Sequence, residues 1–316
     1  MIHVEVTTNQ QVNVNMIKKV FDTNLDMKDY LCSSKKDSYP TKAEPALRLY
    51  VKVSDDCNAK CSFCVNESTK DYGKLDLVKL EYVIRYLYDN HLLHGVNLSG
   101  GEPMTHPDTV NDIIQMIYRI DPRIEVQLST NGLNFRKLLE FDNIDNLESI
   151  HVSRHHYIDS VNESIFRSKS VASADDIMTV QEGLKDKKLI NINTLVMKGY
   201  IDSLKEIKEM LNHVGDMGIY KNGFVSLMKC NEFARDRFIN FNDIFSNLDR
   251  DFHLAHHFYS KEYCECVDGV YISDSAKLVE FYARMVKDCD CSEKVMQLVY
   301  TSDNRVLSGF GGKQIY

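Results

Sequence analysis

The strongest constraint on the fold is a regular alternation of strand-like and helix-like segments between residues 46 and 228. Residues 47–53 alternate apolar and polar side chains, as a half-buried strand does, whereas residues 77–90 carry apolar side chains at helical spacing. Similar strand patterns follow at residues 95–99, 124–128, 147–152, 189–196 and 223–228, and helical patterns lie between them at residues 108–119, 135–141, 174–185 and 204–214. Strands that alternate with helices in this way predict a parallel sheet with right-handed crossovers.

Such a sheet curls into a barrel, and a closed barrel of this kind needs about eight strand–helix units. Because the sequence shows about six, we predict an α/β fold in the form of a partial (β/α)6 TIM-like barrel that stays open. Residues 1–45 are predicted to be an N-terminal extension, and residues 46–228 the barrel core. Residues 229–316 lose the alternation, and we expect them to form a small C-terminal extension that contains cysteines.

The composition excludes several classes of function. The net charge of −8 and the pI of about 5.8 disfavour a general nucleic-acid surface, which needs clustered Lys and Arg. No apolar run is long enough to span a membrane, and the N-terminus shows no signal-peptide pattern, so we expect a cytoplasmic protein. In a large chain without an export signal, the nine cysteines are more consistent with metal ligands than with disulfides.

Three of these cysteines lie together directly after the first predicted strand. Cys57, Cys61 and Cys64 have the spacing C-x3-C-x2-C, with Phe63 before the last of them. A short loop of this kind can wrap three thiolates around one face of a [4Fe–4S] cluster and leave the fourth iron open for a small molecule. The alternative is zinc, but structural zinc normally takes four ligands in two separated pairs, and no fourth ligand is near.

Polar motifs also end the next three predicted strands. Ser99-Gly100-Gly101-Glu102-Pro103 ends the second, Ser129-Thr130-Asn131-Gly132 the third, and Ser153-Arg154-His155-His156 the fourth. Barrel enzymes place their chemistry at the carboxyl ends of their strands, so we expect these motifs to meet at one site.

Together these motifs resemble the radical S-adenosylmethionine (radical SAM) superfamily. The resemblance implies an enzyme in which S-adenosylmethionine chelates the open iron, and an electron from the cluster, supplied by a flavodoxin- or ferredoxin-type donor, releases a 5′-deoxyadenosyl radical. It implies that Glu102 accepts from the methionyl amino group and that Arg154 pairs with the carboxylate. The cofactor-binding residues implied are Phe63, Gly100, Gly101, Glu102, Pro103, Ser129, Asn131, Ser153, Arg154, Met197 and Met228. Phe63 and Met228 are equally consistent with core positions. His155 and His156 are either acid–base groups or packed histidines.

Residues 193–199 and Met228 resemble the GTP 3′,8-cyclase branch of the superfamily. At the positions where that branch carries basic residues for the triphosphate, this chain has Tyr50, Asn97 and Asn191, none of which is charged. We therefore predict a small-molecule or nucleoside-like substrate other than GTP, with a peptide as the alternative. A non-enzymatic iron–sulfur or zinc protein is disfavoured, because an electron carrier has no use for an open cluster iron.

The remaining cysteine pairs predict a second metal site. Cys264 and Cys266 form one C-x-C pair and Cys289 and Cys291 another, while Cys230 stands alone after the sixth predicted strand. Four or five thiolates could hold a second [4Fe–4S] cluster. A zinc site with four thiolate ligands and unliganded cysteines remain the alternatives.

Overall fold

The structure is a computed structural model that describes residues 17–27, 47–65, 73–245, 252–260, 264–273, 278–282, 295 and 297–316. For residues 252–260 and 264–273 it describes the backbone only.

The centre of the protein is a parallel sheet whose strands follow one another in chain order, as predicted. Its six core strands are β3 (Leu47–Ser54), β4 (Leu93–Gly100), β5 (Glu125–Thr130), β6 (Ser149–Ser153), β7 (Ile190–Val196) and β8 (Lys221–Ser226). Each of the five neighbouring pairs is parallel. The carboxyl ends of all six strands therefore meet at one end of the sheet.

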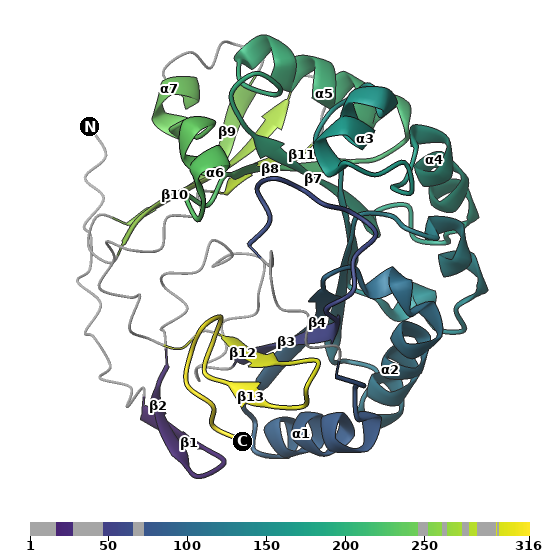
Figure 1. Ribbon diagram of the computed structural model, residues 1–316, viewed down its shortest axis with the longest axis vertical. Helices are drawn as coiled ribbons and strands as arrows, with labels where there is room; N and C mark the ends of the chain where they lie inside the picture. Colours follow the sequence, from purple (N-terminus) through teal and green to yellow (C-terminus); the bar gives the residue numbers. More distant parts are fainter. Residues whose placement is uncertain are drawn as a thin grey trace, which may run out of the picture.

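Helices cover the outer face of the curved sheet (Figure 1). They are α1 (Leu77–Asp89), α2 (Pro107–Ile120), α3 (Asp159–Phe166), α4 (Ala174–Gly183) and α5 (Leu204–Asp216), and the short helices α6 (Glu232–Asp236) and α7 (Phe241–Phe245) follow β8. The helix expected at residues 135–141 is a 3-10 helix, Phe135–Glu140, and two shorter ones span Pro103–Thr105 and Ile144–Asn146. Each long helix turns an apolar stripe inward; in α1 it consists of Leu80, Val83, Ile84 and Leu87.

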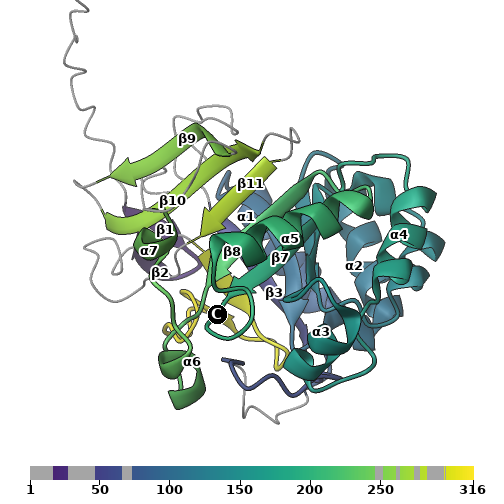
Figure 2. The ribbon, with the colours of Figure 1, turned by 90° about the horizontal axis from the view of Figure 1, so that it is seen from above.

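The C-terminal region does not stand apart from the barrel. β11 (Leu278–Tyr282) pairs in parallel with β8, and β12 (Gln297–Tyr300) pairs in parallel with β3, at the opposite edge. Antiparallel strands extend both edges: β10 (Cys264–Ser273) and β9 (Phe252–Ser260) beyond β11, and β13 (Val306–Leu307) beyond β12. β9 and β13 are not paired with each other, so the barrel is open (Figures 1 and 2). The division at residue 228 remains a prediction, but residues on both sides of it share one sheet.

An N-terminal hairpin packs below the barrel wall. It consists of β1 (Ile17–Val20) and β2 (Thr23–Asp26), and Phe21 at its turn stacks on Tyr86 of α1 and on Tyr316, with ring centroids 4.3 and 4.5 Å apart. The chain's last residue is thus held against α1.

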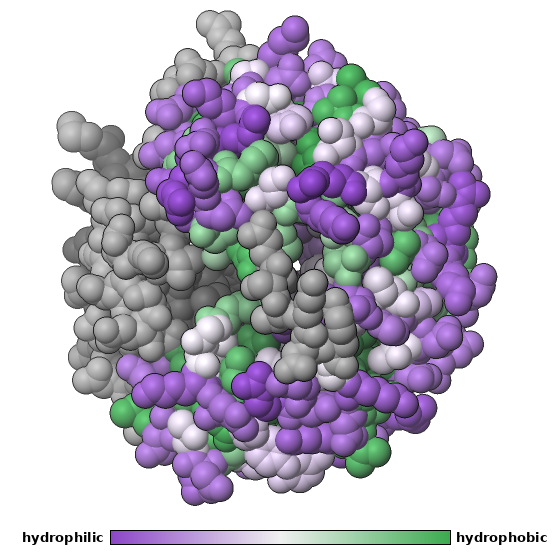
Figure 3. All heavy atoms as spheres, in the orientation of Figure 1, coloured by the Kyte–Doolittle hydropathy of each residue, from purple (hydrophilic) through white to green (hydrophobic). Residues whose placement is uncertain are grey.

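The face seen in Figure 3 has a largely hydrophilic rim, as expected for a chain with this charge. Among the described residues, no helix has both the length and the apolar composition needed to cross a membrane.

Candidate active site

The loop that carries the three cysteines crosses the carboxyl end of the barrel (Figure 1). It leaves β3 and is held on the far side by two hydrogen bonds: the Lys60 amide donates to the Phe166 carbonyl of α3 (2.9 Å), and the Asn231 side chain before α6 donates to the Ser62 carbonyl (2.9 Å). The cysteines are thus positioned by bonds to elements far away in the sequence.

Two glycines at the end of β4 let this loop start close to the sheet. A Cβ atom on Gly100 would lie 2.3 Å from the Ser54 carbonyl oxygen, and one on Gly101 would lie 2.3 Å from that of Asp56. The amides that follow use this closeness: Gly101 donates to Ser54 and Glu102 donates to Asp56, both at 2.7 Å. Gly100 and Gly101, which were predicted from the sequence, therefore allow the start of the cysteine loop to lie against the end of β4.

The three thiols suit a positively charged metal centre. Burial raises the pKa of Cys57, and burial together with the neighbouring Cys64 and Cys57 raises the pKa of Cys61 to about 12. Thiolates here need a compensating cation, and iron provides one. Among the described residues, no three His, Cys, Asp or Glu side chains are grouped as ligands of a single metal ion. The donor set fits a cluster bound by three thiolates better than a mononuclear zinc site.

Glu102 is buried, with 1% of its surface exposed, and it joins the ends of β4 and β5. Its Oε1 accepts from the Met104 amide (3.0 Å) and the Thr130 hydroxyl, and its Oε2 accepts from the Asn131 amide (2.6 Å). These three bonds leave one of about four acceptor positions for a ligand. Burial raises the pKa of Glu102 to about 7 against the opposing effect of these donors. An adjacent ammonium group would favour the ionised form.

Asn131 links this carboxylate to the cysteine loop. Its side-chain amide donates to Asn58 Oδ1 (2.8 Å) and lies 3.9 Å from Cys57 Sγ, while Asn58 Nδ2 donates to the Ser170 carbonyl (2.7 Å). Glu102 and Asn131 thus meet the loop as predicted from their strand ends. The contacts of Asn58, Phe166 and Asn231 were not predicted from the sequence; the position of Asn58 between two cysteines was the one local signal.

Arg154 lies behind the site and is fully buried. Its guanidinium donates to Asp159 (2.6 Å) and to the carbonyls of Tyr157 (3.2 Å) and Ala172 (3.4 Å). These bonds tie the end of β6 to the starts of α3 and α4. Pairing with a ligand carboxylate stays a prediction for this residue, whose observed partners are all within the protein.

The two histidines after Arg154 are packed. His155 stacks on Phe166 (centroids 4.8 Å apart) and meets Phe63 edge-on (5.3 Å), and its Nδ1 accepts from the Leu195 amide (3.2 Å). His156 Nδ1 accepts from the Ile158 amide (3.0 Å), and burial lowers its pKa. His155 thereby supports Phe63, next to Cys64.

The other predicted cofactor-binding residues fall into two groups. Ser129 and Ser153 are half-buried on the inner side of the sheet, and Pro103 is buried at the end of β4. Met197 is fully buried in a small apolar cluster that Phe63 packs against, and Met228 is half-buried after β8. Contacts of these residues with a cofactor stay predictions.

Of the cysteines predicted for a second metal site, Cys230 is exposed beside the first loop, with its Sγ 3.8 Å from the Phe63 carbonyl oxygen. Cys264 and Cys266 lie on β10, of which only the backbone is described. Cys289 and Cys291 lie outside the described residues.

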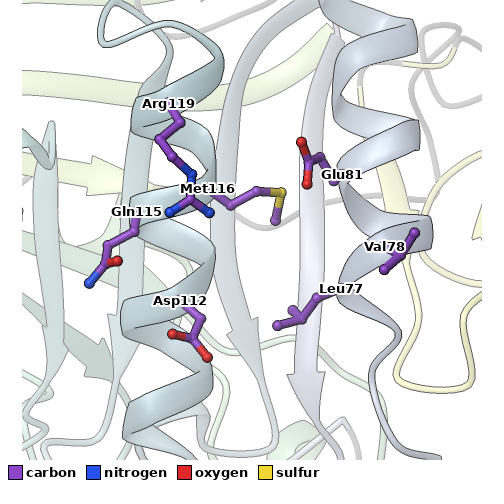
Figure 4. Close-up of a pocket in the computed structure, with 7 residues that line it drawn as sticks. All are labelled: Leu77, Val78, Glu81, Asp112, Gln115, Met116 and Arg119. Atoms are coloured by element: carbon purple, nitrogen blue, oxygen red, sulfur yellow. The ribbon is translucent and has the colours of Figure 1, made fainter.

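A separate hollow of about 200 Å³ lies between α1 and α2, on the outside of the barrel (Figure 4). It is lined by Leu77, Val78, Glu81, Asp112, Gln115, Met116 and Arg119. It belongs to the helix layer and shares no residue with the cysteine loop.

Comparison with known proteins supports the arrangement. Residues 51–214 match the Radical SAM superfamily. The GTP 3′,8-cyclase of Limosilactobacillus fermentum is 28% identical over 175 residues, which cover 54% of this chain and 52% of that protein. Molybdenum cofactor biosynthesis protein 1 of Mus musculus is 26% identical over 159 residues, covering 48% of this chain and 24% of that protein. The chain thus spans about half the length of the first of these relatives, and less of the second.

Among solved structures, Streptococcus suis SuiB bound to S-adenosylmethionine superposes with a TM-score of 0.60 at 14% identity, over 85% of this chain and 63% of that one. SuiB bound to its precursor peptide SuiA gives a TM-score of 0.58 at 14% identity, over 84% and 60% of the two chains. At this identity the likeness concerns the fold alone, and it agrees with the open TIM-like barrel.

The glycine contact generates a prediction. In Gly101→Ala the new methyl group overlaps the carbonyl oxygens of Asp55 and Asp56, so the cysteine loop has to move. We expect a loss of about 1–3 kcal/mol in the free energy of unfolding and a clear loss of bound iron after anaerobic reconstitution. Urea unfolding and iron analysis measure the two effects.

Gly311→Ala is the control, because its Cβ would meet nothing within 4 Å. Its positive φ of 71° costs about 1 kcal/mol in the tail without touching the loop, so iron loading should be unchanged. Normal iron content in Gly101→Ala would contradict the assigned role of the glycine.

Proposed function

Because the chain belongs to the radical SAM superfamily, we propose that it binds a [4Fe–4S] cluster through Cys57, Cys61 and Cys64 and cleaves S-adenosylmethionine reductively. The observation that carries the proposal is the connection of the three-thiol loop, through Asn131, to the buried carboxylate of Glu102. Cluster and S-adenosylmethionine together would supply a 5′-deoxyadenosyl radical that takes a hydrogen atom from the substrate.

The residues of the protein would hold the cluster and orient S-adenosylmethionine. The thiols would hold the cluster on one face and leave the opposite face to the ligand. The Asn131 amide, 29 residues further along the chain, fixes Oε2 of Glu102. The remaining acceptor position of this carboxylate would take an N–H of the methionyl ammonium group. The stack of Phe63, His155 and Phe166 would keep water from one side of the loop.

For the substrate we propose a small molecule or a nucleoside-like molecule other than GTP. A peptide is the second candidate, because SuiB, which shares the fold, has been solved with its precursor peptide. A flavodoxin- or ferredoxin-type donor would supply the electron, and a reducing cytoplasm would suit the exposed thiols.

The mechanism is tested on anaerobically reconstituted protein. With dithionite and S-adenosylmethionine, the wild type should release 5′-deoxyadenosine, and the Cys57→Ala/Cys61→Ala/Cys64→Ala variant should release none, because the cluster has lost its ligands. Chromatography of the quenched mixture measures the product. Cys230→Ala, which removes a thiol outside the loop, is the matched control and should keep the cluster's absorbance. Undiminished release by the triple variant would refute the mechanism.

GTP should be neither bound tightly nor cyclised. Tyr50, Asn97 and Asn191 supply no charge for a triphosphate, and the ring of Tyr50 is already packed edge-on against Phe310 of the C-terminal tail (4.7 Å). Incubation with GTP, S-adenosylmethionine and dithionite, followed by mass spectrometry, should return GTP unchanged. A cyclised product would overturn this prediction.

We further propose that Cys264, Cys266, Cys289 and Cys291 hold a second [4Fe–4S] cluster. Iron and sulfide analysis should then give about eight irons per chain, and a variant with all four changed to Ala about four. About four irons with stoichiometric zinc in the wild type would support a zinc site instead. About four irons without zinc would mean that these cysteines bind no metal.

A further inference from the structure

At the level of Ser129, the inner face of the central strands is polar, in contrast to their outer face. Leu128, Val152 and Ile192 belong to the apolar core that packs against the helices. Since side chains alternate along a strand, their neighbours Ser129, His151 and Asn191 face the barrel interior. These three residues stand side by side on β5, β6 and β7 in the register Ser129–His151–Asn191. We call these three residues, together with Asn97 of β4 and Asn193 of β7, the interior tier. Asn97 and Asn193 are included because they form hydrogen bonds with Ser129 and His151.

This interior tier lies directly below the candidate active site. Ser129 is two residues before Asn131, whose side chain contacts the cysteine loop, and two residues of strand span about 7 Å. A molecule held by the tier would therefore lie beneath the loop that carries the thiols.

Hydrogen bonds within the tier fix the orientation of two amides. The Ser129 hydroxyl donates to Asn97 Oδ1 (3.3 Å), so the Asn97 side chain turns its NH2 group elsewhere. The Asn193 NH2 group donates to His151 Nδ1 (3.3 Å), and His151 Nε2 is 2.9 Å from the Ser149 hydroxyl. Asn193 thus keeps its carbonyl oxygen for another partner. The tier offers one amide donor and one amide acceptor on neighbouring walls.

Asn191 is the observation that points to a ligand. Only 7% of the residue is exposed, yet within the described part of the chain its side-chain amide makes no hydrogen bond. Among the described residues, neither atom of this amide is a fully enclosed polar atom without a partner, so both are open to the barrel interior. An amide has donors and an acceptor, and here no protein group uses them, so they are available to a ligand.

The charges that reach the interior are already paired among the described residues. Arg48 contacts Glu125 (3.0 Å) and Glu148 (3.6 Å), and Lys221 contacts Glu280 (2.8 Å). Lys52, at the upper end of β3, contacts Asp55. In these ion pairs the acidic groups outnumber the basic groups. They therefore offer no surplus positive charge to a phosphate or carboxylate.

We infer that the barrel interior binds an uncharged planar group that has a hydrogen-bond donor and an acceptor side by side, such as a carboxamide, a lactam or the edge of a nucleobase. This inference rests on the proposed function in that it names the substrate class for the same site. Asn97, Asn191 and Asn193 are the residues that recognise it. A phosphorylated form of the same molecule is excluded from the tier.

Thermal unfolding of the protein without added ligand provides the first test. Asn191→Leu removes an amide that bonds to no protein group, and its side chain has a similar volume, so Tm should stay within about 2 °C of the wild type. Asn162→Leu is the matched control: Asn162 is 1% exposed and accepts from the His155 amide (2.8 Å), so its replacement should lower Tm. A lowered Tm in Asn191→Leu would show that the amide has a structural partner and would overturn the inference.

Binding provides the second test, by saturation-transfer NMR with three neutral probes, inosine, uridine and nicotinamide. Each is compared with its phosphorylated counterpart: inosine 5′-monophosphate, uridine 5′-monophosphate and nicotinamide mononucleotide. At least one neutral probe should bind, more tightly than its counterpart, and its signal should fall at least tenfold in Asn191→Leu. Stronger binding of the phosphorylated members, an unchanged signal in the variant, or no binding of any neutral probe would overturn the inference.

These readouts are separate from the proposed chemistry. Release of 5′-deoxyadenosine by the wild type without any probe reports on cleavage of S-adenosylmethionine alone. If that release fails while the neutral probes bind, the proposed function is wrong and the interior site stands. If release occurs while no neutral probe binds, or while Asn191→Leu lowers Tm, the function stands and the substrate class is wrong.

Discussion

The arrangement of the site depends on the buried carboxylate of Glu102. A carboxyl group with 1% exposure is costly unless its oxygens are satisfied, and here donors from Met104, Thr130 and Asn131 satisfy them. These donors lie at the ends of two neighbouring strands, so the carboxylate fixes one end relative to the other. Asn131 then extends the connection to Asn58 and Cys57. The cysteine loop, which has no regular secondary structure of its own, takes its position from this connection and from the close approach at Gly100 and Gly101.

Much of the fold could be predicted because the signal is local. The core strands alternate or run apolar over five to eight residues, and α1, α2 and α5 have strong apolar stripes at helical spacing. The short helix α3 was not predicted, since eight residues with three buried side chains give a weak period. The places of β11 and β12 could not be predicted either. β12 pairs with β3, about 250 residues earlier, and pairing across such a separation leaves no mark on either strand's pattern.

The residues that meet at the site could be predicted from the sequence, but most of their hydrogen-bond and packing partners could not. Strand ends converge in a parallel barrel, so the neighbourhood of Cys57, Glu102 and Asn131 followed from topology. A polar residue at a strand end can either contact a ligand or bond within the protein, and its partners elsewhere in the chain decide between the two. Arg154 has an internal partner in Asp159, and His155 lies between two aromatic rings, one of which comes from α3. The hydrogen bonds of Asn58 and Asn231 depend on loop conformation, which no periodic pattern describes.

Burial around the cysteines also explains why the site would select a cationic centre. The stack of Phe63, His155 and Phe166 adjoins an apolar cluster that includes Leu195 and Met197, and Cys61 lies against the Phe166 carbonyl. Burial is the main cause that raises the pKa of Cys61 to about 12. An isolated thiolate is unstable in such a place, whereas three thiolates that share a metal cluster are not. Below the loop the interior tier carries amides, hydroxyls and an imidazole, with the nearby charges paired. We therefore propose that the two parts have different roles. The loop, with Cys57 exposed and Cys61 and Cys64 half-buried, would hold the charged centre, and the neutral polar interior would discriminate between substrates by hydrogen bonding and not by charge.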